Sequence, residues 1–329
     1  MGRIVTLASG QFGDLPLEDL CVLARKIGYD GLELATHAHF DVPRALGDSS
    51  YIPQVKETLA KNGLQCQAIS AHLTGQCVGD LWDERLDNFA PQRLAGKAEE
   101  IRAWAVEEMK NTARAARLFG VSVVNGFTGS PIWARWYSYP QTSEEMIEAG
   151  FQRIYDLWTP IFDVFDECGV RFALEVHPSE IAFDYYTTKR LLEKFKYRET
   201  LGLNFDPSHL VWQGVSETAF IRKFAGRIYH VHMKDVKLFR NELGGILGSF
   251  LPFGDTRRAW NFVSPGHGDV DFDGIIRELN RAGYAGPLSV EWEDSGMDRI
   301  FGATESCEYV KKINFSASDA AFDSALKRD

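Results

Sequence analysis

Short apolar runs alternate with longer stretches of helical periodicity along almost the whole chain. Runs of four to eight apolar residues bounded by turn residues predict buried strands, and apolar positions three or four residues apart predict helices. The expected strands are residues 4–8, 31–35, 64–72, 122–127, 172–176, 201–205, 228–233 and 287–291. The expected helices are residues 16–27, 52–62, 98–119, 143–168, 187–196, 216–225, 271–282 and 302–313.

This order predicts a single (β/α)8 TIM barrel, because eight strand–helix units in about 310 residues match its arithmetic. Glycine stands between a helix end and the next strand in the GYDG, NGLQ, FGVS and CGVR segments, as at helix C-caps. A doubly wound sheet is the alternative, but no G-x-G-x-x-G follows the first strand. We expect residues 1–315 to form the barrel domain and residues 316–329 to form a polar tail.

A long insertion, about residues 236–265, is expected after the seventh strand. Loops of this length are usually functional or interfacial. Its aromatic and arginine residues could form a platform over a bound ligand, or an oligomer contact. They are Phe239, Phe250, Phe253, Trp260, Phe262, Arg257 and Arg258. A second aromatic group after the fourth strand could build the opposite wall, and it comprises Trp133, Trp136, Tyr137 and Tyr139.

Charge and composition exclude several classes of partner. The net charge of −10 gives no electrostatic support for binding nucleic acid or an acidic membrane. No apolar run approaches the roughly 18 residues that a membrane span needs, and no signal peptide is visible. The five cysteines are scattered and odd in number. We therefore expect a cytoplasmic protein with reduced thiols.

Four residues with metal-binding side chains close four successive expected strands: Glu175, Asp206, His232 and Glu291. In a parallel barrel the ends of neighbouring strands meet at one mouth, so these side chains would converge there. Three carboxylates with one imidazole suit Mn, Mg or Co better than a closed structural zinc site. The alternatives are a surface carboxylate for Glu175 and a turn or N-cap role for Asp206 before a proline.

All eight histidines fall in or after the expected strands, which predicts a mouth rich in ligands. They are His37, His39, His72, His177, His209, His230, His232 and His267. Because residues two apart in a strand share a face, Glu175 and His177 should both point into the mouth. By the same rule His230 lies on the face of His232, but deeper in the barrel.

The chain resembles the xylose isomerase-like superfamily of sugar isomerases and epimerases over about residues 4–313. The motifs that match are ALEVHP (173–178), NFDPSHL (204–210), YHVHMKD (229–235), GHGDVDF (266–272) and LSVEWED (288–294). The resemblance implies that Glu175, Asp206, His232 and Glu291 bind one divalent metal, manganese before magnesium or cobalt. It makes His209, of the Asp-x-x-His pair, a substrate-hydroxyl contact.

Further candidates follow from the same motifs. His72, Lys234 and Trp212 are expected to bind substrate with His209, and Glu175, His177 and Glu291 are expected to be catalytic. His177 departs from the Glu-Pro-Lys of xylose isomerases, and an imidazole there could shuttle a proton near neutral pH. The segments EVHPSEIAFDYYT, NFDPSHLVWQG and EDSGMDR also resemble a branch that includes α subunits of C-glycoside deglycosidases. That branch implies 3-oxo-glycoside substrates and a small partner subunit.

The expected activity is isomerisation or epimerisation of a sugar by removal of a proton next to a carbonyl, through an enediolate. The alternative is a lyase that cleaves 3-oxo-glycosides by elimination. Phosphoester hydrolysis, as in DNA endonuclease IV barrels, would need more metal ligands and a basic groove, and a non-catalytic sugar-binding protein would not need all four ligands. We expect a small-molecule sugar or 3-oxo-glycoside as substrate, an oligomeric protein, and neither nucleic acid nor membrane as partner.

Overall fold

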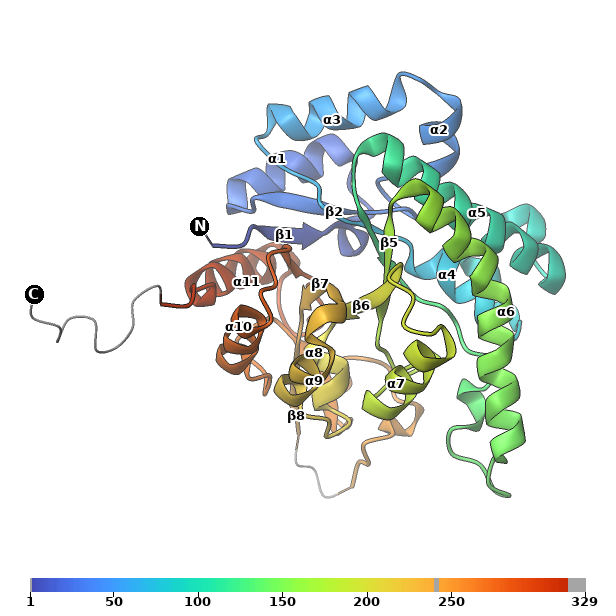
Figure 1. The fold of residues 1–329 in the computed structure, drawn as a ribbon. Helices are drawn as coiled ribbons and strands as arrows, with labels where there is room; N and C mark the ends of the chain where they lie inside the picture. The colour runs from blue at the N-terminus through green and yellow to red at the C-terminus, as the bar shows by residue number, and fades with distance from the viewer. Residues whose placement is uncertain (1, 240–242, 319–329) are drawn as a thin grey trace, which may run out of the picture.

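Eight parallel strands close into a barrel in a computed structural model that describes residues 2–239 and 243–318 (Figure 1). The strands follow one another around the barrel in the order β1-β2-β3-β4-β5-β6-β7-β10, and β10 pairs with β1. They span Val5–Ala8 (β1), Gly31–Ala35 (β2), Ile69–Ser70 (β3), Val123–Gly126 (β4), Arg171–Glu175 (β5), Leu201–Phe205 (β6), Ile228–Met233 (β7) and Leu288–Val290 (β10). The predicted TIM barrel is confirmed, and a doubly wound sheet is excluded.

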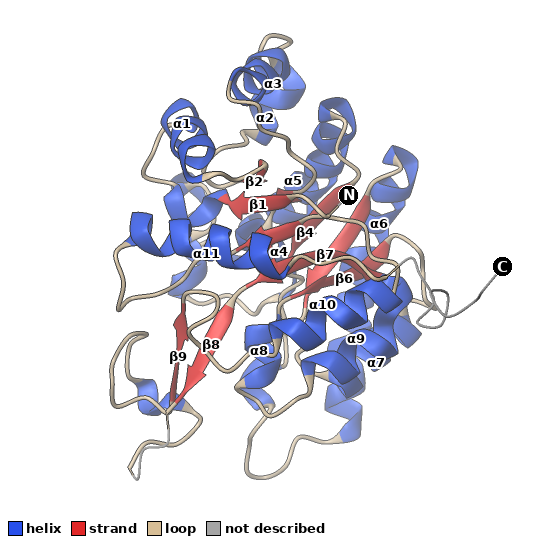
Figure 2. Cartoon of the chain, turned by 90° about the vertical axis from the view of Figure 1, so that its left-hand side faces the viewer, coloured by secondary structure: helices blue, strands red, loops and turns tan. Residues whose placement is uncertain are grey.

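Helices surround the barrel on its outside (Figures 1 and 2). They span Leu17–Ile27 (α1), Val42–Gly47 (α2), Tyr51–Lys61 (α3), His72–Gly79 (α4), Ala98–Phe119 (α5), Glu144–Cys168 (α6), Tyr185–Lys194 (α7), Pro207–Val211 (α8), Glu217–Phe224 (α9), Phe272–Arg281 (α10) and Arg299–Ile313 (α11). The eight predicted helices correspond to α1, α3, α5, α6, α7, α9, α10 and α11, whereas α2, α4 and α8 are short additions. In the described residues, no helix is both long and apolar enough to cross a lipid bilayer.

The apolar face of α6 fixes β5 in place. Trp158, Phe162 and Phe165 surround Phe172 of β5, with ring centroids 4.8, 5.8 and 5.8 Å away, and all four side chains are buried. Burial of each large apolar side chain stabilises the fold by about 1.5–3 kcal/mol. This packing therefore holds the strand that ends at Glu175.

The third strand is shorter than predicted, because only Ile69–Ser70 pair regularly within the expected 64–72. The Gln65 carbonyl accepts a hydrogen bond from the amide of Leu32 in β2, and the Ala68 carbonyl accepts one from the amide of Leu34. The segment from Gln65 to Ala68 therefore has one residue more than the part of β2 that it pairs with. Such a bulge interrupts a regular ladder. His72 consequently begins α4 rather than ending a strand.

The segment between β7 and α10 contains a two-stranded antiparallel sheet, Asp235–Leu238 (β8) with Trp260–Val263 (β9), which projects from the barrel (Figure 2). Asp235 fixes its base, since its carboxylate accepts hydrogen bonds from the amides of Gly266 and Gly268 at 2.9 and 2.8 Å. Residues 240–242 of this segment, and 319–329 of the predicted tail, lie outside the described residues.

Candidate metal centre

The barrel brings the four predicted ligands together. Glu175 ends β5, Asp206 follows β6, His232 lies in β7 and Glu291 follows β10. One oxygen or nitrogen atom from each side chain lies within 4.8 Å of the others, and the first three side chains are buried. His232 Nδ1 faces the carboxylates, at 3.3 Å from Glu175 Oε2 and 3.2 Å from Glu291 Oε2.

Asp206 uses its two oxygens differently. Oδ1 caps α8 by accepting hydrogen bonds from the amide and hydroxyl of Ser208, at 2.8 and 2.7 Å. Oδ2 is buried and has no hydrogen-bond partner, and His209 Nε2 lies 3.4 Å from it. A buried carboxylate oxygen that accepts no hydrogen bond is costly, so its position among two other carboxylates and an imidazole fits a bound cation.

The protonation of the cluster also fits a cation. Burial would lower the pKa of His232, but Glu33, Glu291 and Glu175 outweigh it and raise that pKa well above its usual value. Burial raises the pKa of Asp206 to about 6, although His209 and Lys234 oppose the rise. The carboxylates thus keep His232 protonated. A divalent ion that displaced this proton would balance the negative charge of the same carboxylates.

Two histidines lie against the predicted ligands, and a third packs against one of these two. His72 Nε2 is 2.8 Å from Glu175 Oε2, and His209 Nε2 is 3.3 Å from Glu175 Oε1. The His177 ring packs edge-on against His209, with centroids 4.0 Å apart. Burial, reinforced by the neighbouring His209, lowers the pKa of His177 well below its usual value, so His177 is neutral and can accept a proton.

Not every histidine belongs to this site. His39 Nε2 is hydrogen-bonded to the Leu15 carbonyl at 2.9 Å, and the half-exposed His267 pairs with Glu305 at 3.1 Å. Both lie outside the residues that line the cavity over the four predicted ligands. Position after a strand therefore selects the right end of the barrel but not the residues that reach its axis.

Lys234 and Trp212 have different surroundings. Lys234 is buried in the cavity, where its Nζ lies 3.1 Å from Glu291 and 2.9 Å from Glu293 and 4.4 Å from the Phe262 ring centroid. Trp212 does not line the cavity, because its indole stacks on Trp260 of β9 at 4.6 Å and 8°. The predicted substrate contact of Trp212 is corrected accordingly: it packs against the projecting hairpin.

The cavity over the predicted ligands has a volume of about 520 Å³. Phe253 and Phe262, from the insertion, line it. Its other polar lining residues are Gln11, Glu33, His37, Ser70, His72, Glu175, His177, His209, Lys234, Glu291 and Glu293. Aromatic and charged groups therefore face one another across a space of the size that small-molecule sites have.

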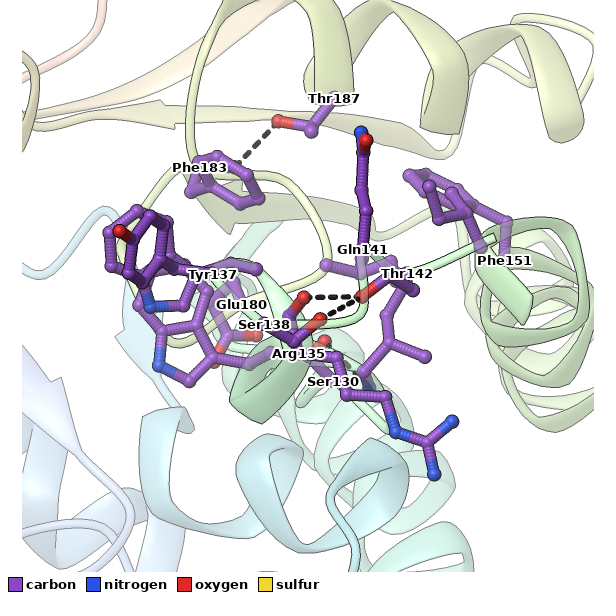
Figure 3. Close-up of a pocket in the computed structure, with 15 residues that line it drawn as sticks. Ser130, Arg135, Tyr137, Ser138, Gln141, Thr142, Phe151, Glu180, Phe183 and Thr187 are labelled. Carbon is purple, nitrogen blue, oxygen red and sulfur yellow. Dashed lines mark hydrogen bonds between the residues drawn. The ribbon is translucent and has the colours of Figure 1, made fainter. Parts of the chain in front are cut away.

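The aromatic residues after β4 do not form the opposite wall. Trp133, Trp136 and Tyr137 line a separate cavity of about 440 Å³ between this loop, α6 and the β5–α7 loop, and Tyr139 is fully exposed. Figure 3 shows this second cavity with Glu180 and Phe183 among its lining residues. In this second cavity Phe183 packs edge-on against Trp133, with ring centroids 5.3 Å apart.

Three polar residues at the barrel centre were missed by the sequence analysis: Glu33, Asn125 and Asn204. All three side chains are buried, and Asn204 Nδ2 donates to Glu175 Oε2 at 3.0 Å. The sequence did contain a signal for Glu33. It lies inside the apolar run GLELA, as Glu175 lies in FALE, and a carboxylate in a buried strand needs a partner. The asparagines gave no comparable signal, since a neutral amide is common at strand ends.

The chain matches the family described as xylose isomerase-like TIM barrel over residues 21–313, and it belongs to that family. It is 26% identical to the uncharacterized protein YfiH of Bacillus subtilis (strain 168) over 332 residues, covering 94% of this chain and 98% of that protein. It is 35% identical to an inosose dehydratase of Geobacillus thermodenitrificans over 171 residues, 52% of this chain and 54% of that enzyme.

Solved structures share the fold at low sequence identity. The probable 3-DHS dehydratase AsbF of Bacillus anthracis superposes with a TM-score of 0.67 at 19% identity, covering 94% of this chain and 98% of that one. The IolI protein with a bound zinc atom gives 0.62 at 20% identity, over 94% and 96% of the two chains. An L-ribulose 3-epimerase gives 0.62 at 19% identity, over 95% of each chain. Sugar-modifying dehydratases and epimerases thus share this barrel.

Proposed function

We propose that the protein is a divalent-metal-dependent isomerase or epimerase that moves a proton on the carbon next to a sugar carbonyl. One observation carries the proposal. Asp206 Oδ2 accepts no hydrogen bond and has His209 Nε2 at 3.4 Å. It lies with Glu175, His232 and Glu291 around a common point beneath a cavity that also contains His177 and Lys234. A Lewis-acid position beside a proton acceptor and a proton donor is what enolisation requires.

Glu175, Asp206, His232 and Glu291 would hold the ion, which when bound polarises a carbonyl oxygen of the substrate. Manganese is the proposed metal, with magnesium or cobalt as alternatives, because carboxylates dominate the donor set. The zinc in the related IolI structure supports a divalent ion without selecting one.

His177 is the proposed proton acceptor. Burial lowers its pKa, so the imidazole is neutral near pH 7 and has a ring nitrogen free of a proton, although the same shift makes it a weaker base than a free imidazole. In the proposed mechanism this nitrogen takes a proton from the substrate carbon and returns it to a neighbouring carbon or to the other face. Its Nδ1 lies 3.1 Å from Ser179 Oγ, which fixes the ring orientation. Glu175 and Glu291 are then left to bind the ion, and His72 and His209 are available to contact substrate hydroxyl groups.

A second candidate is elimination, and the position of Lys234 favours it. Burial would lower the pKa of Lys234, but Glu291 and Glu293 outweigh it and raise that pKa well above its usual value. Lys234 is therefore an ammonium near neutral pH, and the raised pKa makes it a weaker acid than a free lysine. What favours elimination is its position in the cavity, where the ammonium could hydrogen-bond to a departing hydroxyl or aglycone on the carbon beyond the carbonyl and stabilise its developing negative charge. The likeness to inosose dehydratases also supports this alternative, with water as the leaving group, and a 3-oxo-glycoside would lose its aglycone in the same way.

The test is incubation of manganese-loaded protein with ketoses, inososes and 3-oxo-glycosides in deuterated water, followed by NMR of the products. Deuterium in an isomerised or epimerised sugar is the expected result, whereas loss of water or of an aglycone would establish elimination. His177→Gln should lower turnover by about 10²–10⁴-fold while metal binding persists. His267→Gln is the matched control, since this half-exposed histidine lies outside the cavity, and its turnover should be unchanged. Metal binding without turnover of any of these substrates would refute the proposal.

A further inference from the structure

Glu33 of β2 occupies the centre of the barrel beneath the predicted ligands, and its side chain is buried. Its carboxylate is surrounded by donors from three other strands. Oε2 lies 2.7 Å from His230 Nε2 and 2.6 Å from Ser289 Oγ, and Oε1 lies 2.8 Å from Asn125 Nδ2. His232 Nε2 lies 3.2 Å from both oxygens.

The two ring nitrogens of His232 have different carboxylate neighbours. Nδ1 faces Glu175 and Glu291, whereas Nε2 faces Glu33. Amide groups also approach the ring, with Asn204 Nδ2 3.2 Å from Nδ1 and Asn125 Nδ2 3.3 Å from Nε2. A neutral imidazole carries one proton, and a nitrogen that binds a metal must be free of it. A proton shared between Nε2 and the Glu33 carboxylate leaves Nδ1 free.

We propose that Glu33 is the positioning residue of the metal centre: it accepts the Nε2 proton of His232 and thereby fixes Nδ1 as the ligand atom. The inference rests on the proposed metal-dependent function. A carboxylate partner raises the basicity of a ligating imidazole and fixes its ring orientation, and loss of such partners typically lowers metal affinity 10–100-fold. Glu33 also lines the cavity, but its carboxylate meets the Nε2 side of the ring, away from the predicted ligands, so it would act on the ion through His232.

A second metal site is the competing interpretation, since atoms of Glu33, His230 and His232 lie within 4.8 Å of one another. The other neighbours of Glu33 argue against it. An amide nitrogen of Asn125 donates to Oε1 and the hydroxyl of Ser289 donates to Oε2, so the carboxylate lone pairs already accept protons. A cation there would also face the Asn125 amide group, which offers its hydrogens rather than a lone pair.

The experiment compares Glu33→Gln with the wild type and with Glu278→Gln. Glutamine keeps the size of the side chain but replaces one oxygen by a donor that faces other donors. Glu278 is the matched control, because it is also a buried carboxylate but pairs with Arg222 of α9, at 2.9 Å, on the outside of the barrel. The first readout is the number of manganese ions bound and their dissociation constant, measured by isothermal titration calorimetry.

We expect one ion per wild-type chain, a 10–100-fold weaker dissociation constant in Glu33→Gln, and a value within about threefold of the wild type in Glu278→Gln. Equal affinity in Glu33→Gln and the wild type would overturn the inference while leaving the proposed function intact. Two ions in the wild type and one in Glu33→Gln would overturn it in favour of a second metal site. A wild type that binds no metal would contradict both the proposed function and this inference.

The second readout does not depend on whether Glu33→Gln folds. NMR of zinc-loaded wild-type protein with isotope-labelled histidines distinguishes an imidazole bound through Nδ1 and protonated at Nε2 from the reverse. The first pattern is expected for His232. The reverse pattern, with metal on Nε2, would overturn the inference whatever the variants do.

Discussion

Lys234 places a buried ammonium group between two carboxylates of the cavity. The loss of folding stability expected on removing this group can be calculated from the structure. Nζ lies 3.1 Å from Glu291 Oε2 and 2.9 Å from Glu293 Oε2. Methionine has a similar length and no charge, so Lys234→Met removes the cation without opening a large cavity. We expect the variant to destabilise the metal-free protein, because it leaves the carboxylate of Glu291 buried without this partner.

The size of the loss follows from the geometry. Two unit charges about 3.1 Å apart attract by roughly 5 kcal/mol at an effective dielectric constant of about 20, before the cost of burying the ammonium. Removing one member of a buried pair typically costs about 3–5 kcal/mol. Glu293 adds little, since 37% of its side chain is exposed. An unfolding entropy of about 2.1 cal/mol/K per residue over 329 residues converts this loss into a Tm lower by about 4–7 °C.

The assay is calorimetric unfolding in chelator and in excess manganese. A bound ion at Glu291 would replace the missing charge, so the difference between variant and wild type should shrink when manganese is present. Lys237→Met is the control, because its pair with Asp269, at 2.7 Å, is exposed and contributes only about 0–1 kcal/mol. Equal losses in the two variants, or a Lys234→Met deficit that manganese does not reduce, would refute the reasoning.

Three further predictions concern the protein beyond Lys234. Chelation should abolish turnover, and manganese at about a thousandfold above its dissociation constant should restore it. The same manganese should raise Tm by about 6 °C, because binding contributes about 4.1 kcal/mol to the free energy of unfolding. An unchanged Tm would contradict metal binding. Burial and then Asp80 raise the pKa of Glu180 to about 8. The folded state therefore keeps a proton that the unfolded state loses above about pH 4.5, so wild-type stability relative to Glu180→Gln should fall from pH 5 to 8 in urea titrations. Gly75→Ala should cost about 1–3 kcal/mol in the same assay, because its Cβ would overlap the Phe127 carbonyl oxygen, whereas Gly47→Ala meets no neighbour and should be neutral.

The barrel could be predicted from the sequence because its strands are buried on both faces and its helices on one. FALE and LGLNF are almost uninterrupted apolar runs, and Gly120 and Gly169 end α5 and α6 in the left-handed conformation that C-cap glycines favour. The bulge beside β2 could not be predicted, since it depends on how residues 65–68 meet a neighbouring strand. Local periodicity contains no information about that register.

The convergence of the four predicted ligands was predictable, because the strand ends of a closed barrel meet at one mouth. Glu175 and His232 reach the axis because the barrel closes, and the alternation of side chains correctly separated His232 from the deeper His230. The predicted substrate contact of Trp212 was wrong because its indole stacks on Trp260, which is 48 residues further along the chain. Long-range stacking of this kind leaves no trace in the spacing of either residue.

Asp206 shows why the competing sequence interpretations of one residue were difficult to rank. The N-cap interpretation and the metal-ligand interpretation were treated as alternatives, yet the carboxylate has two oxygens. Oδ1 caps α8, and Oδ2 lies in the cluster without a hydrogen-bond partner. The cap explains why the side chain is held still, and a fixed oxygen is what a metal site needs. The structural role therefore supports the functional one, and the same holds for Glu33, whose hydrogen bonds to Asn125 and Ser289 fix the carboxylate that faces His232.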